Sequence, residues 1–126
     1  EQGLTVMVVD ESITVRKDTS RLLARQTMEV LTAKAGGDAL DVLQARVPDV
    51  MLLDVEMPRM DGFELARHVK HSSILKHIPI IMITSRTGEK HRQRAMSIGV
   101  NSYLGKPYQE EELLDNIYSC LAEVET

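Results

Sequence analysis

Five side chains able to do chemistry lie directly after apolar runs of the sequence or within two residues of one. They are Asp10, Glu11, Asp54, Thr84 and Lys106. Carboxylates that come together repel one another unless a cation balances them, and ligation by oxygen alone suits Mg²⁺. A hydroxyl and a lysine beside such an ion form a clamp for a phosphoryl group, and a carboxylate in that clamp can act as a nucleophile. The residue types therefore indicate phosphoryl transfer through an aspartyl phosphate.

Each of these residues also has an ordinary structural interpretation when taken alone. Asp54 can cap a loop, Asp10 and Glu11 can cap a helix, and a lysine or threonine after a strand is usually a solvated or turn residue. These interpretations do not explain why all five side chains follow the ends of four separate predicted strands. We therefore interpret them as one site.

The elements that position the site alternate regularly along the chain. Strands are predicted at 5–9, 29–33, 50–53, 79–83 and 101–104, and a helix is predicted after each. The first helix is expected over 13–26 with Ser12 as N-cap, the second follows the Gly36-Gly37 break with Asp38 as cap, and Gly99 ends the fourth. The pattern predicts a flavodoxin-like (βα)5 α/β fold, a three-layer sandwich around a parallel sheet of order 2-1-3-4-5. Its crevice lies at the carboxyl ends of strands 5–9 and 50–53, where the three acids fall.

Composition narrows the class of protein. The 126 residues suffice for one domain, 1–126, and leave no room for two. The net charge of −4 argues against nucleic-acid binding, and no apolar run is long enough to span a membrane. Cys120 is the only cysteine, so we expect a buried, inert thiol and a cytoplasmic location. A chain that opens at Glu1 without methionine is expected to be a piece of a longer protein.

Five separate segments also carry a family resemblance over nearly the whole chain. They are Val8-Val9-Asp10-Glu11-Ser12, Leu53-Asp54, Met57-Pro58 with Asp61-Gly62, Ile83-Thr84, and Lys106-Pro107. In this set and order, the sequence resembles the response-regulator receiver domains of two-component signalling.

The resemblance implies a role for each site residue. Asp54 is the expected phosphoacceptor. A histidine kinase or a histidine phosphotransfer domain is expected to supply the phosphoryl group. The implied Mg²⁺ ligands are Glu11, Asp54, the backbone carbonyl of Glu56 and, through water, Asp10. Thr84 and Lys106 are expected to bind the phosphoryl oxygens, Tyr103 to act with Thr84 as a switch, and Lys106-Pro107 to be a cis peptide bond.

The sequence departs from the family pattern at one position, and two further positions bear on dephosphorylation. Glu11 stands where the family more often has a second Asp, and its longer side chain is expected to tilt or weaken the metal. Glu56 and Arg86 occupy positions that tune dephosphorylation. They either pair across the site mouth and hinder an attacking water, or Glu56 orients that water.

A closer resemblance lies in Ser12-Ile13-Thr14-Val15-Arg16-Lys17. This segment is similar to receivers attached to CheA-like hybrid kinases, particularly those of type IV pilus chemosensory systems. It implies a place at the carboxyl end of a multidomain kinase.

Three functions remain open on the sequence. The first is a phosphorylation-dependent switch or phosphate sink, which is no enzyme beyond assisting its own phosphorylation and dephosphorylation. The second is a small phosphatase with Glu56 as proton donor, although the chain has no segment for a cap or substrate pocket. The third is a pseudo-receiver for docking, against which the intact acids, Thr84 and Lys106 argue. For a switch, a downstream partner is expected at the face formed by the fourth helix, the fifth strand and the fifth helix.

Overall fold

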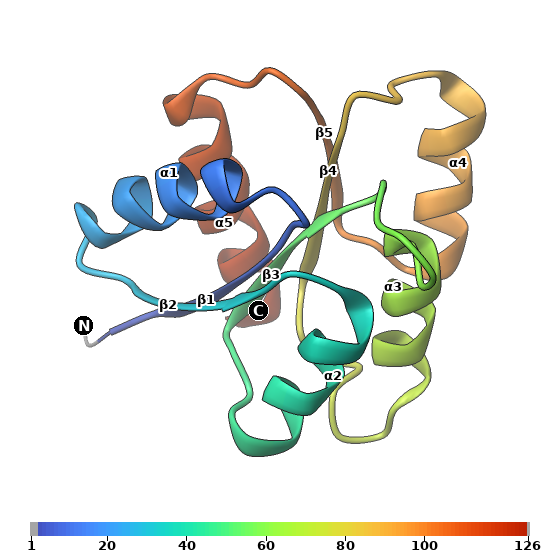
Figure 1. The fold of residues 1–126 in the computed structure, drawn as a ribbon, viewed down its shortest axis with the longest axis horizontal. Helices are drawn as coiled ribbons and strands as arrows, with labels where there is room; N and C mark the ends of the chain where they lie inside the picture. Colours follow the sequence, from blue (N-terminus) through green and yellow to red (C-terminus); the bar gives the residue numbers. More distant parts are fainter. Residues whose placement is uncertain (1–2, 126) are drawn as a thin grey trace.

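A five-stranded parallel sheet forms the middle of the computed structural model, which describes residues 3–125 (Figure 1). Its strands are β1 (Thr5–Val9), β2 (Glu29–Ala33), β3 (Val50–Asp54), β4 (Ile80–Thr84) and β5 (Ser102–Gly105). They lie in the order β2-β1-β3-β4-β5, so the predicted order is confirmed. Each strand begins and ends within one residue of its predicted bounds.

Five helices cover the two faces of this sheet. They are α1 (Ile13–Ala24), α2 (Gly36–Ala45), α3 (Gly62–His71), α4 (Glu89–Ile98) and α5 (Glu110–Glu125). α1 and α5 lie on one face, and α2, α3 and α4 lie on the other (Figure 1). The predicted flavodoxin-like three-layer α/β arrangement is therefore confirmed.

The central strands are buried on both faces because their side chains alternate between two cores. In β1, Met7 and Val9 enter the core under α2, α3 and α4, whereas Val6 and Val8 enter the core under α1 and α5. All residues of β3 and β4 are buried. This alternation explains why these strands are apolar at nearly every position, and it brings only their last residues, Asp54 and Thr84, to the carboxyl edge.

Two of the predicted helix ends are confirmed. The Ser12 hydroxyl accepts a hydrogen bond from the Val15 N–H at 3.2 Å, as an N-cap should. Gly99 ends α4 in the left-handed region at φ 111°.

Two other predicted ends are wrong. α2 begins at Gly36 rather than after the glycine pair, with Ala35 as N-cap and Asp38 inside the first turn. Gly36 lies so close to Met60 that a Cβ would come within 2.6 Å of the Met60 sulfur, so this glycine serves packing rather than a break. α1 ends at Ala24 instead of 26.

Thr27, just after α1, has an unfavourable backbone conformation with φ at 60°. A β-branched residue is costly there, by about 1–2 kcal/mol, and glycine is not. We expect Thr27→Gly to raise the free energy of unfolding by about 1 kcal/mol after its extra chain entropy is counted. Urea unfolding measures this change. Thr32→Gly, at an exposed position within β2, is the control and should lower the same free energy.

Cys120 is buried, as expected, and burial raises the pKa of its thiol. Within residues 3–125, no helix is both long and apolar enough to cross a membrane.

Candidate functional site

Two buried carboxylates lie side by side at the carboxyl edge of the sheet. Asp54 is the last residue of β3, and Asp10 follows the last residue of β1. Val9 pairs with Leu53 in the sheet register, which places the two aspartates next to each other. Each is only 5% exposed. Burial and the charge of Asp10 together raise the pKa of Asp54.

Lys106 balances this pair of acids. Its Nζ donates to Asp10 Oδ2 at 3.1 Å and to Asp54 Oδ1 at 3.3 Å. Burial disfavours the ammonium, but the charges of Asp54 and Asp10 outweigh this effect, so the pKa of Lys106 is raised. The cis peptide bond between Lys106 and Pro107 is confirmed. The structure thus gathers three of the predicted residues into one charged cluster.

The loop after β3 is held against Asp54 by main-chain contacts. The Glu56 N–H approaches Asp54 Oδ1 at 3.4 Å, and the Gly62 N–H donates to the Val55 carbonyl at 2.9 Å. Asp61 caps α3 by accepting from the Glu64 N–H at 2.9 Å. A Cβ on Gly62 would lie 2.4 Å from the Asp54 carbonyl oxygen, so only glycine fits this contact. The Asp61-Gly62 pair therefore fixes the backbone of Asp54.

Thr84 and Tyr103 both contact the backbone of Arg86. Thr84 is fully buried, and its hydroxyl accepts from the Arg86 N–H at 3.0 Å. The Tyr103 hydroxyl donates to the Arg86 carbonyl at 2.5 Å. Tyr103 is 9% exposed, and burial raises the pKa of its phenol. One residue thus connects the buried hydroxyl on β4 to the tyrosine on β5.

The Arg86 side chain reaches across the mouth of the site. Its Nε donates to Glu56 Oε2 at 2.9 Å, and the Ser85 hydroxyl donates to Glu56 Oε1 at 3.1 Å. The pairing of Glu56 with Arg86, one of the two arrangements expected from the sequence, is confirmed. Both oxygens of Glu56 are therefore engaged.

The Asp10 and Asp54 carboxylates fit a magnesium ion, which proteins usually bind through one or two carboxylates and a phosphate. In residues 3–125, the Glu56 carbonyl accepts no hydrogen bond and is free to serve as a further ligand. Glu11 is different. Its side chain is exposed, and no group of three or more His, Cys, Asp or Glu side chains in the described part of the chain is arranged to hold a metal ion. The expected meeting of three carboxylates is therefore limited to two, because the Glu11 side chain remains in solvent.

Three further residues support the site without having been predicted to do so. The Arg16 guanidinium donates to the Asp10 carbonyl at 2.7 Å, and the hydroxyls of Thr19 and Tyr108 are 3.2 Å apart. Arg16 belongs to a motif seen in the sequence, but nothing there shows its target. Thr19 and Tyr108 are too far apart in the chain for any local pattern to connect them.

A groove of about 490 Å³ opens beside Lys106, between α1 and the start of α5. It is lined by Val15, Asp18, Thr19, Leu22, Lys106, Pro107, Tyr108 and Glu110. Its apolar floor and its position next to the acids provide a surface on which another helix can lie against the site.

Comparison with known proteins gives a consistent result. Residues 6–118 match the family model described as the response regulator receiver domain. The protein PilG of Pseudomonas aeruginosa is 37% identical over 115 residues, which cover 91% of this chain and 85% of PilG. The sensor histidine kinase CheAY of Helicobacter pylori is 34% identical over 110 residues, 86% of this chain but only 14% of CheAY. The chain spans about half the length of several other curated relatives, which are response regulators named MprA. Among solved structures, the chemotaxis protein CheY4 of Vibrio cholerae superimposes with a TM-score of 0.90 at 36% identity, covering 95% of this chain and all of that one.

Proposed function

Since this chain belongs to the response regulator receiver domain family, we propose that Asp54 accepts a phosphoryl group from a phosphohistidine and that residues 1–126 form one phosphorylation-dependent switch. The chain is thus a receiver of a two-component phosphorelay, from a signalling family whose members are generally not catalytic enzymes. The observation that carries the proposal for Asp54 is the Lys106 ammonium bound to both buried aspartates, with the Thr84 hydroxyl one strand away.

The proposed step is a displacement at phosphorus. An Asp54 carboxylate oxygen forms the new O–P bond as the N–P bond to the donor imidazole breaks, and the electron pair leaves with that imidazole. Lys106 and the Thr84 hydroxyl then hold the phosphoryl oxygens. Asp10, Asp54, the Glu56 carbonyl and, through an extended side chain, Glu11 would hold Mg²⁺, which when bound offsets negative charge on the transferred group.

Magnesium affinity tests the proposed role of Glu11. Because most of the coordination sphere should be water, we expect weak binding that Glu11→Gln weakens severalfold further by removing a charged ligand. The chain has no tryptophan, so amide NMR titration or calorimetry is the suitable measurement. Glu112→Gln, which removes an exposed carboxylate from α5, is the control. Equal affinity of the Glu11 variant and the parent would remove Glu11 from the ligand set.

The Glu56–Arg86 pair should slow loss of the phosphoryl group, because it restrains a carboxylate that otherwise can orient an attacking water. We expect Arg86→Ala to shorten the lifetime of the phosphorylated chain about tenfold. The backbone contacts of Arg86 with Thr84 and Tyr103 survive this substitution. The decay of radiolabelled phosphoprotein measures this lifetime. The control is Arg21→Ala, which breaks the exposed ion pair with Asp18 and should leave the lifetime unchanged. A longer lifetime would mean that the pair itself positions the water.

Intact mass after incubation with Mg²⁺ and a small phosphodonor tests the function as a whole. A switch or phosphate sink should gain one phosphoryl group and keep it long enough to detect. Continued turnover of many phosphoesters without an adduct would indicate the phosphatase, and no reaction would indicate a docking pseudo-receiver.

Two surfaces are proposed for partners. The groove beside Lys106 would receive a helix of the histidine kinase or phosphotransfer domain, because it gives access to Asp54. The face of α4, β5 and α5 would carry the signal onward, since Thr84 and Tyr103 both contact Arg86 at its edge. Amide shifts with beryllofluoride, a phosphoryl mimic, should then include Tyr103 and α4. Changes confined to the loops of Asp10, Asp54 and Lys106 would favour a phosphate sink.

The wider setting is proposed from the relatives. The likeness to PilG and to part of CheAY supports a cytoplasmic chemosensory pathway, and the segment Ser12–Lys17 favours one of the type IV pilus kind. Attachment at the carboxyl end of a CheA-like hybrid kinase is consistent with the small share of CheAY that this chain covers.

A further inference from the structure

Positive charge is concentrated on one side of this acidic chain. Between Met57 and Val100 there are eight Lys or Arg residues, three Asp or Glu residues and all four histidines. The rest of the chain holds seven Lys or Arg and sixteen Asp or Glu. Most of the Lys and Arg residues between Met57 and Val100 belong to α3, to α4 or to the connection after α3. α3 and α4 lie side by side (Figure 1).

The ion pairs identified among the described side chains do not involve the cations of α3 and α4. Every ion pair among the described side chains lies elsewhere, on Arg21, Arg25, Arg46, Arg86 or Lys106. Arg67 of α3 is exposed and forms no ion pair. Arg94 of α4 lies 4.3 Å from the centre of the Phe63 ring of α3, so its charge is held against that helix. α3 and α4 thus each present an arginine outside the ion pairs of the described side chains.

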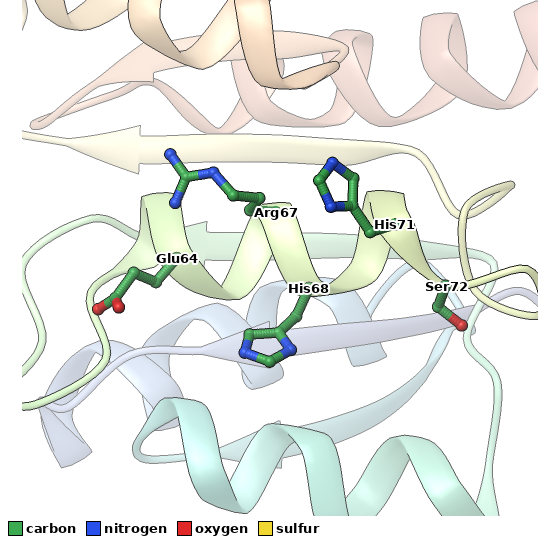
Figure 2. Close-up of a pocket in the computed structure, with 5 residues that line it drawn as sticks. All are labelled: Glu64, Arg67, His68, His71 and Ser72. Carbon is green, nitrogen blue, oxygen red and sulfur yellow. The ribbon is translucent and has the colours of Figure 1, made fainter.

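A hollow of about 460 Å³ accompanies these charges. Its lining residues are Glu64, Arg67, His68 and His71 of α3 and Ser72 just after it. Figure 2 shows Arg67 and His71 on one side of the helix and His68 on the other. Glu64 offsets part of the charge at one end. Ile74, just beyond the other end, is 74% exposed and offers an apolar contact.

We propose that this cationic surface, formed by Arg67, His68 and His71 of α3 with Arg94 of α4, binds an acidic segment of a partner protein. A short acidic segment fits because it can contact the cationic surface alone. A long polyanion would extend beyond this surface and be repelled by the strongly acidic remainder of the chain. The hollow accommodates side chains of the segment, and Ile74 gives it an apolar anchor. Binding at this surface requires no phosphoryl group. A negative result for peptide binding would therefore not contradict the proposed role of Asp54.

The test is an NMR titration of the whole isotope-labelled chain with a synthetic amphipathic peptide of Glu and Leu at helical spacing. We expect saturable shifts at the amides of Arg67 to His71 and around Arg94. Arg67→Glu should weaken binding about tenfold, and His71→Glu, one turn further along α3, should weaken it in the same direction. Lys17→Glu makes the same change in net charge as Arg67→Glu at an exposed site on α1, and should change affinity less than about twofold.

Four outcomes would overturn the proposal. They are shifts located elsewhere, equal weakening by Lys17→Glu, tighter binding of a DNA duplex or an anionic lipid vesicle at the same residues, and concentration-dependent shifts of this surface without peptide. The last would assign the surface to a second copy of the chain.

Discussion

Replacing Asp54 with asparagine should abolish phosphorylation of this chain. The amide is neither a nucleophile nor a charged metal ligand, and it has nearly the shape of the carboxylate that it replaces. Asp54 is almost fully buried at the end of β3, where the Lys106 ammonium contacts both it and Asp10. We therefore expect the parent chain to gain the mass of one phosphoryl group from a small phosphodonor with Mg²⁺, and Asp54→Asn to gain none.

The matched control is Asp41→Asn, at an exposed aspartate of α2. This variant should be phosphorylated as the parent is. Circular dichroism should show the same helix content for both variants, so that loss of the adduct cannot be attributed to unfolding. An adduct that persists on Asp54→Asn would assign the phosphoacceptor to another residue.

Gly62→Ala should be the most destabilising of the substitutions considered. Its Cβ would come 2.4 Å from the Asp54 carbonyl oxygen and 2.8 Å from the Val55 Cα, and both are backbone atoms that cannot rotate away. Accommodation requires the loop and the end of β3 to shift. We expect the free energy of unfolding to fall by about 3 kcal/mol, and phosphorylation to slow because Asp54 moves relative to Lys106.

Gly37→Ala is the corresponding control. Gly37 is exposed within α2 and has no neighbouring atom within 4 Å of an added Cβ. Alanine has the higher helix propensity, so this variant should gain about 1 kcal/mol. Urea denaturation of the two variants separates a packing effect from the general effect of adding a methyl group. Equal changes in both would contradict the close contact at Gly62.

The features that the sequence predicted well depend on short-range patterns. The apolar runs of β1, β3 and β4 are buried on both faces, so each run gives its strand directly, and the alternation with helices then permits few arrangements. The same order brings Asp10, Asp54 and Lys106 together, because strand ends meet at one edge. The residues of this candidate site could therefore be found without coordinates.

What the sequence could not show depends on the direction of individual side chains. Glu11 follows Asp10 directly, yet one carboxylate is buried and the other remains in solvent. The Gly36-Gly37 pair suggested a break, but contact with Met60, which is distant in the sequence, gives Gly36 a place inside the helix. The error at Gly36 arises because the decisive contact is tertiary, and the direction of the Glu11 side chain is equally absent from any local pattern.

The position of β1 has a consequence for how the chain is made. β1 is the first of the five strands of this sheet to be synthesised, yet it lies inside the sheet, where Val6 pairs with Val30 on one side and Val50 on the other. A ribosome adds about 5–20 residues per second, so this apolar strand waits a few seconds for its second neighbour. During that interval its unpaired backbone and side chains are open to chaperones and to other nascent chains. Slow translation between β2 and β3 should therefore lower the yield of native protein more than slow translation after β4.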